Sequence, residues 1–219
     1  MSRRPRSSRL LSAAAVLAAL ACLAQPRPAA SAPPGGTTTT AVTRVEEDWE
    51  VYLSIPRGER GSPQVVLHTA PDPNSRFRCL FLINHVDHPD FAPGGAQLQL
   101  WDGNSLAGVF TFGAESLDIP DEKILLTLFM ERANGKLRYG LSKVASKSWG
   151  TLSPPGFECT ASDSTASFPA YSTSVAAENT EILLGSNRVN SLKIVSVRSY
   201  AGGKATTGPG VAVYTAPAQ

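Results

Sequence analysis

Residues 124–141, ILLTLFMERANGKLRYGL, contain two runs in which apolar residues recur at every second position, joined by Asn134-Gly135. The recurring apolar residues are Ile124, Leu126, Leu128, Met130, Leu137, Tyr139 and Leu141. A period of two is typical of a β-strand that buries one face. The dipeptide Asn-Gly favours a type I′ turn, because both of its positions adopt a positive φ. The stretch therefore predicts an antiparallel β-hairpin.

Shorter runs of the same kind lie on both sides of this hairpin, separated by turn residues. We predict further strands at 49–55, 64–69, 78–86, 96–101, 106–112, 174–177, 181–185 and 190–200. The run 78–86 is apolar on both faces, as expected for a central strand. A short helix within 172–184 is an alternative to a strand there. The pattern predicts an all-β fold, an antiparallel β-sandwich of the jelly-roll kind.

The first 32 residues have the composition of a secretory signal peptide. Four arginines before position 10 precede an uncharged apolar run over 10–24, and small residues follow at 30–32. We predict cleavage after Ala24 or after Ala32. Lipidation of Cys22 is an alternative. A lipidated cysteine usually has an aliphatic residue three positions before it and a small residue two before it, whereas Ala19 and Leu20 stand in the opposite order. No apolar run is long enough to span a bilayer as a helix, so we expect a secreted protein, extracellular or periplasmic, without a transmembrane segment.

Charge and composition define the remaining regions. Removing residues 1–32 changes the formal net charge from +2 to −3, because five arginines and no acids are lost. The exported chain then has no basic excess that would suggest nucleic-acid binding. We predict a disordered leader over 33–44, one β-sandwich domain over 45–201 and a flexible tail over 202–219, in which 211–214 is an alternative last strand. The oligomeric state stays open.

Two cysteines, Cys79 and Cys159, remain after export. An even number in an oxidising compartment favours a disulfide, which would close a loop of about 80 residues and stabilise the fold by roughly 4 kcal/mol. Two buried free thiols are the alternative, because Cys79 lies within an apolar run.

The acidic stretch 46–50, EEDWE, fits the pattern E-x-D-x-E found on the catalytic strand of one jelly-roll glycosidase family. In that pattern Glu46, Asp48 and Glu50 would share a strand face and flank the scissile bond. The residues between them should be apolar, yet one of them is Glu47. We therefore interpret the stretch as the acidic beginning of the first strand, with Trp49 in the core, and assign no catalytic residue.

Two stretches contain side chains that bind metal ions. His85, Asp87, His88 and Asp90 lie within six residues, but a closed zinc site needs further ligands, and the only other histidine is His68. We interpret this stretch as a polar loop and predict no metal site. Calcium is an alternative at two further places, formed by Asp102 and Asn104, and by Asp118, Asp121 and Glu122, although neither follows a known loop pattern.

The row Gln97, Gln99 and Trp101 gives the candidate binding residues. On a strand these three side chains share one face, while Leu98 and Leu100 point to the other. An indole stacks on a sugar ring, and amides both donate to and accept from hydroxyl groups. Tyr139 and Trp149 are alternative aromatic residues for such a site.

Residues 47–200 resemble a concanavalin A-like or laminin-G-like jelly roll. The resemblance lies in the hairpin ILLTLFMERANGKLRYGL and in the strand that ends VSVRSY at 195–200. The segments VEEDWE, GGAQLQLW and SNRVNSL are also similar to a group of uncharacterised secreted bacterial proteins. The resemblance implies an exported β-sandwich and carries no known activity. We expect a non-enzymatic recognition or cell-surface domain that binds a polysaccharide or surface glycan; a glycosidase or lyase, and a purely structural protein, are the alternatives.

Overall fold

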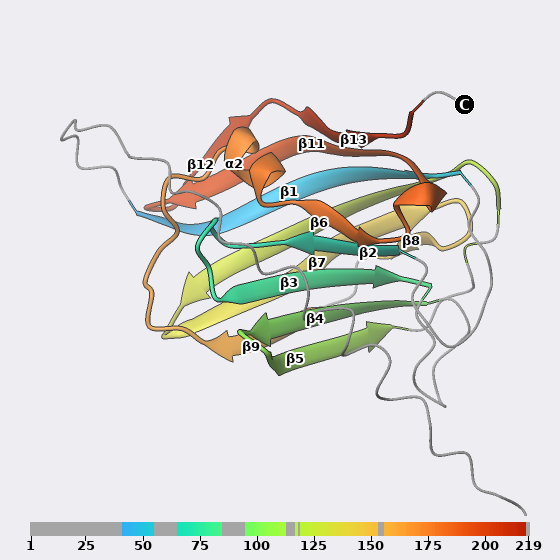
Figure 1. Cartoon of the computed structure of the whole chain (residues 1–219). Helices are drawn as coiled ribbons and strands as arrows, with labels where there is room; N and C mark the ends of the chain where they lie inside the picture. Colours follow the sequence, from blue (N-terminus) through green and yellow to red (C-terminus); the bar gives the residue numbers. More distant parts are fainter. Residues whose placement is uncertain are drawn as a thin grey trace, which may run out of the picture. The chain divides into compact units, whose positions relative to one another are not determined.

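The computed structural model describes residues 41–54, 65–84, 95–112, 117, 119–152 and 156–217. All of them belong to one compact unit, Thr39–Gln219. Within this unit the chain forms two antiparallel sheets that pack face to face as a β-sandwich (Figure 1). The predicted all-β fold class is therefore confirmed.

The larger sheet has eight strands. It consists of β1 (Val42–Leu53), β6 (Glu122–Ala133), β7 (Lys136–Ser146), β8 (Gly150–Leu152), β9 (Glu158–Ser162), β11 (Val189–Ala201), β12 (Lys204–Gly208) and β13 (Val211–Thr215). Its order is β12-β11-β1-β6-β7-β8, with β13 also paired to β11 and β9 also paired to β7. The predicted hairpin forms the β6–β7 pair, and its turn residues Asn134 and Gly135 have φ of 53° and 71°.

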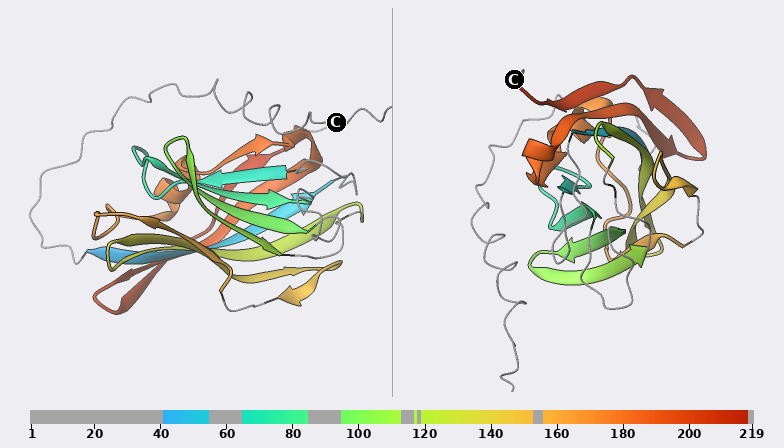
Figure 2. Two further views of the ribbon diagram at one scale, coloured as in Figure 1. Left: turned by 90° about the horizontal axis from the view of Figure 1, so that it is seen from below. Right: turned by 90° about the vertical axis from the view of Figure 1, so that its right-hand side faces the viewer.

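The smaller sheet has five strands in the order β10-β2-β3-β4-β5. Its strands are β2 (Val65–Thr69), β3 (Phe77–Ile83), β4 (Ala96–Asp102), β5 (Ser105–Phe112) and β10 (Glu181–Leu184). The helix α2 (Thr173–Glu178) precedes β10 in the chain, and the 3₁₀ turn η1 (Ser186–Arg188) follows it. Figure 2 shows the two sheets from below and from one end.

One hydrophobic core fills the space between the sheets. Both sheets contribute buried side chains to it. The largest fully buried side chains include Trp49 on β1, Phe81 on β3 and Tyr139 on β7. Trp49 therefore lies in the core, as the sequence predicted.

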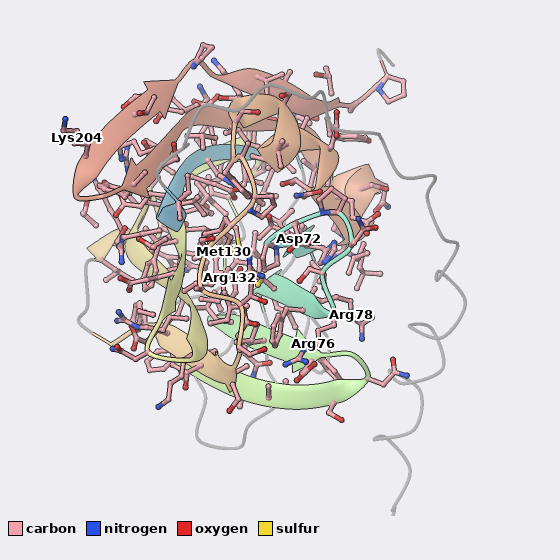
Figure 3. All side chains as sticks on the ribbon, turned by 90° about the vertical axis from the view of Figure 1, so that its left-hand side faces the viewer. Asp72, Arg76, Arg78, Met130, Arg132 and Lys204 are labelled. Atoms are coloured by element: carbon pink, nitrogen blue, oxygen red, sulfur yellow. The ribbon has the colours of Figure 1, made fainter. Side chains whose placement is uncertain are left out.

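A buried ion pair closes one end of the sandwich. Arg132, at the end of β6, and Asp163 are each only 4% exposed, and Arg132 Nε donates to Asp163 Oδ2 at 2.9 Å. Arg132 also donates to the Ser167 carbonyl at 2.7 Å and lies over the Phe168 ring. Figure 3 shows Arg132 near Asp72, whose carboxylate is 3.4 Å from Arg132 Nη2. This cluster ties the larger sheet to the segment that follows β9.

The structure corrects three predictions about individual segments. The strand β1 begins at Val42, so it includes the end of the predicted leader. The tail predicted to be flexible contains β12 and β13, which both pair with β11. The strand β13 confirms the alternative last strand at 211–214. Residues 174–177 are part of a helix and not a strand, because Ser172 caps α2 by accepting a hydrogen bond from the Val175 N–H. Within the described ranges, no helix is long and apolar enough to cross a membrane.

Candidate functional site

The three predicted binding residues lie on the outer face of the five-stranded sheet. Gln97, Gln99 and Trp101 alternate along β4 with Leu98 and Leu100, which are completely buried between the sheets. Gln97 is 8% exposed, whereas Gln99 and Trp101 are half-buried. The indole is therefore neither part of the core nor fully in solvent.

Hydrogen bonds link these side chains into one ladder. Trp101 Nε1 donates to Gln99 Oε1 at 2.9 Å, and Gln99 Nε2 donates to Gln97 Oε1 at 2.5 Å. Gln97 Nε2 in turn donates to Thr111 Oγ1 at 2.9 Å, which extends the ladder to β5. An indole N–H can only donate, so it sets the direction of every following bond. We call Gln97, Gln99, Trp101 and Thr111 the amide ladder.

The ladder keeps spare hydrogen-bonding capacity. Each glutamine amide has a second N–H and a second carbonyl lone pair, and the Thr111 hydroxyl retains its proton. Because the ladder fixes the side-chain rotamers beforehand, a ligand would lose little side-chain entropy on contacting them. Alternating donors and acceptors on a fixed row suit a ligand rich in hydroxyl groups.

An apolar patch borders the ladder on the neighbouring strands. On β3, Leu80 lies opposite Gln99 and Leu82 lies opposite Gln97, and both leucines are nearly buried. The patch is completed by Val66 on β2, with Trp101 and Leu183 packed against it. The guanidinium of Arg78 lies over the Trp101 ring at 5.7 Å from its centroid. These contacts hold the indole in place beside the ladder.

Sequence reasoning missed Thr111 because of a β-bulge. Near the turn, Trp101 pairs with Leu106, and counting back at that register would place Phe110 opposite Gln97. A register shift between Leu100 and Trp101 brings Thr111 opposite Gln97 instead. The alternation of hydrophobic residues alone carries no information on that shift.

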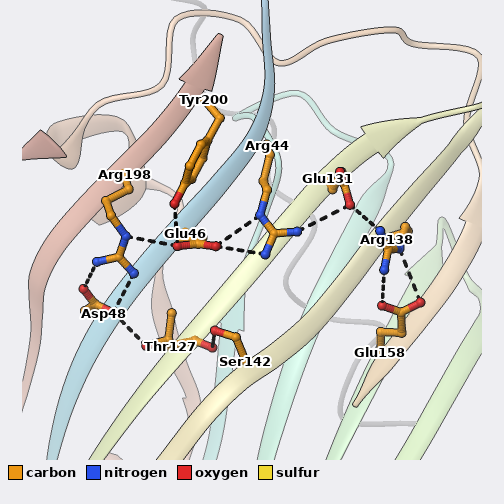
Figure 4. A network of polar contacts seen from close by, with 10 residues as sticks. All are labelled: Arg44, Glu46, Asp48, Thr127, Glu131, Arg138, Ser142, Glu158, Arg198 and Tyr200. Carbon is orange, nitrogen blue, oxygen red and sulfur yellow. Dashed lines mark hydrogen bonds and ion pairs between the residues drawn. The ribbon is translucent and has the colours of Figure 1, made fainter. Parts of the chain in front are cut away.

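The acids of the E-x-D-x-E stretch lie on the outer face of the eight-stranded sheet, near its middle. Glu46 accepts hydrogen bonds from Arg44, Arg198 and Tyr200. Asp48 accepts from Arg198, Ser196 and Thr127. The same network continues through Glu131 and Arg138 to Glu158 (Figure 4). It therefore runs from β11 across β1, β6 and β7 to β9.

This network keeps both acids ionised. Partial burial tends to raise the pKa of Glu46, but hydrogen bonds from Arg44, Tyr200 and Arg198 outweigh it and lower the pKa below its ordinary value. Asp48 shows the same balance, with Arg198, Ser196 and Thr127 lowering its pKa. A glycosidase needs one carboxyl whose pKa is raised, so that it can protonate the leaving group. Neither Glu46 nor Asp48 has that property.

Glu47 points the other way, into the core. It is 1% exposed, and its carboxylate accepts hydrogen bonds from the Tyr171 hydroxyl at 2.5 Å and from Trp49 Nε1 at 3.0 Å. Burial raises the pKa of Glu47 to about 7, although the two hydrogen bonds oppose the rise. A buried, ionised Glu47 would be costly without a cation beside it. The raised pKa removes much of that cost, because the carboxyl can take up a proton.

The expected disulfide is not formed in the structure. Cys79 on β3 and Cys159 on β9 are both buried free thiols that belong to different sheets. Burial raises the pKa of Cys79 well above its ordinary value, and it raises that of Cys159 to about 12. The alternative interpretation, two buried thiols, matches this arrangement, and such thiols are unreactive in the folded state.

The remaining candidates do not converge on a site. Tyr139 and Trp149, the alternative aromatic residues, are buried in the core. Asp102 pairs with Arg76, and Glu122 accepts two hydrogen bonds from Ser148. The stretch with His85 and His88, and also Asp118, lies outside the described residues. Among the residues that are described, no three potential ligands gather around a metal position.

No protein-family model matches this chain, and no curated protein sequence matches it either. The resemblance to concanavalin A-like and laminin-G-like domains therefore stays a prediction beyond the β-sandwich itself.

Proposed function

We propose that this protein is a secreted, non-enzymatic recognition domain that binds a polysaccharide through the outer face of its five-stranded sheet. The observation that carries the proposal is the amide ladder, in which Gln97, Gln99 and Thr111 are held in one hydrogen-bonded row beside the half-buried Trp101. Sugar hydroxyls would bond to the free positions of the half-buried Gln99 and Thr111, and an exposed part of the indole would contact a ring face. The nearly buried Gln97 would hold Gln99 in place.

The environment of Glu46, Glu47 and Asp48 favours the recognition proposal over catalysis. A polysaccharide hydrolase or lyase on the same scaffold is the alternative, and it would use Glu46 and Asp48. Hydrogen bonds from arginine lower the pKa of both acids, so neither is suited to donate a proton. The pKa of Glu47, about 7, would suit a general acid, but this side chain is buried in the core.

The test is depletion of the purified mature protein from solution by insoluble polysaccharides such as cellulose, chitin and xylan. We expect Trp101→Ala to weaken the binding by about ten- to a hundredfold, as the loss of a central aromatic contact does, with the fold intact. Gln99→Ala should weaken it as well, because it removes the middle of the ladder.

Tyr52→Ala is the matched control, since Tyr52 is a half-buried aromatic residue on the outer face of the other sheet. Binding that survives Trp101→Ala and Gln99→Ala, or that fails only in Tyr52→Ala, would place the site elsewhere. Release of soluble sugar by the wild-type protein, abolished by Glu46→Gln, would establish the enzyme alternative instead.

A further inference from the structure

The strand β5 forms one edge of the five-stranded sheet. It runs over eight residues, SLAGVFTF, without a charged residue or a proline. Its inner neighbour is β4, and in the described part of the chain no strand pairs with its other side. An edge strand presents a row of unpaired N–H and C=O groups, to which another strand can bind.

Exposed apolar side chains accompany this free edge. Leu106 is 47% exposed and Val109 is 50% exposed, and both point to the same outer face as Gln99 and Trp101. Proteins usually protect an edge by shortening it, or by placing charges or proline on it. The other described edge strands are shorter, with β10 at four residues and β12 and β13 at five each. Among the edge strands that the structure describes, only β5 combines length, neutrality and exposed apolar residues.

The inner side of β5 is firmly packed. A Cβ atom at Gly108 would lie 3.0 Å from Cys159 Cβ, so β9 lies directly beneath the strand. The ring of Phe157 packs against Phe110 and Phe112, with centroids 4.8 Å and 4.7 Å apart. The edge is therefore held in strand geometry before any partner arrives, which lowers the entropic cost of pairing.

We propose that β5 pairs antiparallel with β5 of a second copy of this chain, around a twofold axis. A twofold interface brings the same surface of both copies together, so a charged edge would repel itself. A neutral edge has no such repulsion, and this property favours a second copy over a charged partner strand. Val109 lies next to the midpoint of β5, so the two Val109 side chains would lie close to the axis.

The dimer would join two five-stranded sheets into one. The two β4 strands would then be separated by both β5 strands, which places the two amide ladders about 14 Å apart on one continuous face. If the ladders bind polysaccharide as proposed above, the pair would bind one chain bivalently and gain avidity. The dimer itself does not depend on that function.

The test is analytical ultracentrifugation of the mature protein and three single variants. We expect the wild type to form a dimer in a concentration-dependent manner, and Val109→Lys and Val109→Glu each to weaken dimerisation by tenfold or more. An equimolar mixture of these two variants should restore the dimer, because opposite charges would meet at the axis. Leu125→Lys is the matched control, since Leu125 is 48% exposed on the outer face of the other sheet, and it should leave the dimer unchanged.

Thermal unfolding of each variant checks that the fold survives, and Leu106→Lys replaces either Val109 variant that fails to fold. A wild type that stays monomeric at the highest soluble concentration overturns the proposal. So does a dimer that Val109→Lys leaves intact, or one that Leu125→Lys disrupts equally. Polysaccharide binding by a monomeric wild type would reject the dimer and leave the proposed function standing.

Discussion

Replacing Glu47 with glutamine should change the pH dependence of folding stability. Glu47 lies on β1, is almost completely buried, and contacts Tyr171 and Trp49 through hydrogen bonds. Burial raises the pKa of its carboxyl from the ordinary 4.5 to about 7. Glutamine has nearly the same shape and retains a carbonyl acceptor, but it cannot ionise.

The sign and size of the effect follow from proton linkage. Between pH 4.5 and about 7 the unfolded chain releases the Glu47 proton, while the folded chain keeps it. The contribution of Glu47 to the free energy of unfolding is therefore largest below pH 4.5. It declines by roughly 3 kcal/mol in all as the pH rises to about 7. The lowered pKa values of Glu46, Asp48 and Asp163 act in the opposite direction, and their contribution is lost only in more acidic solution. The two pH windows are thus separate.

Urea unfolding of the mature protein at about pH 5 and about pH 8 measures this difference. The wild type should be more stable at the lower pH, and Glu47→Gln should remove most of that dependence. Above pH 7 the variant should exceed the wild type by up to about 3 kcal/mol, less whatever is lost at the hydrogen bonds. Glu46→Gln is the control, and it should lose stability at pH 8. Equal wild-type stability at both pH values, or a pH dependence that Glu47→Gln preserves, would refute the reasoning.

Two further substitutions test the polar groups of the core. Tyr139→Phe should raise the free energy of unfolding by about 1 kcal/mol or more, because the buried Tyr139 hydroxyl has no hydrogen-bond partner; a loss of stability in urea unfolding would show that the hydroxyl is satisfied. Arg132→Met should lower the free energy of unfolding by about 3–5 kcal/mol, since it leaves the Asp163 carboxylate buried without its cation. Adding Asp163→Asn to that variant should recover part of the loss, and a single-variant loss below about 1 kcal/mol would contradict the role of the pair.

The fold was predictable where local and global preferences agree. In 124–141 the alternation, the Asn-Gly turn and the burial of one face all favour the same hairpin, and the structure has it. At 172–178 the sequence left two alternatives open, because a run this short fits a strand or one helical turn equally well. The serine cap decides in favour of the helix, and it acts through a contact that hydrophobic patterning does not register.

The candidate site was predictable only in part, for a similar reason. The shared face of Gln97, Gln99 and Trp101 follows from the period of a strand. Their partner Thr111 depends on a bulge two residue pairs from the turn, and the network around Glu46 depends on Arg198, which lies 152 residues away in the chain. Such pairings are set by sheet topology, and no local pattern in the sequence specifies them.

The two outer faces of the sandwich differ in what a ligand would have to displace. Across the eight-stranded sheet, Glu46, Asp48, Glu131 and Glu158 are each paired with arginine, so a polar ligand would exchange existing ion pairs for its own. Such an exchange gains little net free energy, because each new ion pair replaces an existing one. Along β4 and β5, the amide ladder uses only one donor and one acceptor of each glutamine, and the remaining groups lie next to an exposed apolar edge. A ligand there would displace water and no ion pair, so the proposed recognition fits the five-stranded sheet better than the more highly charged face.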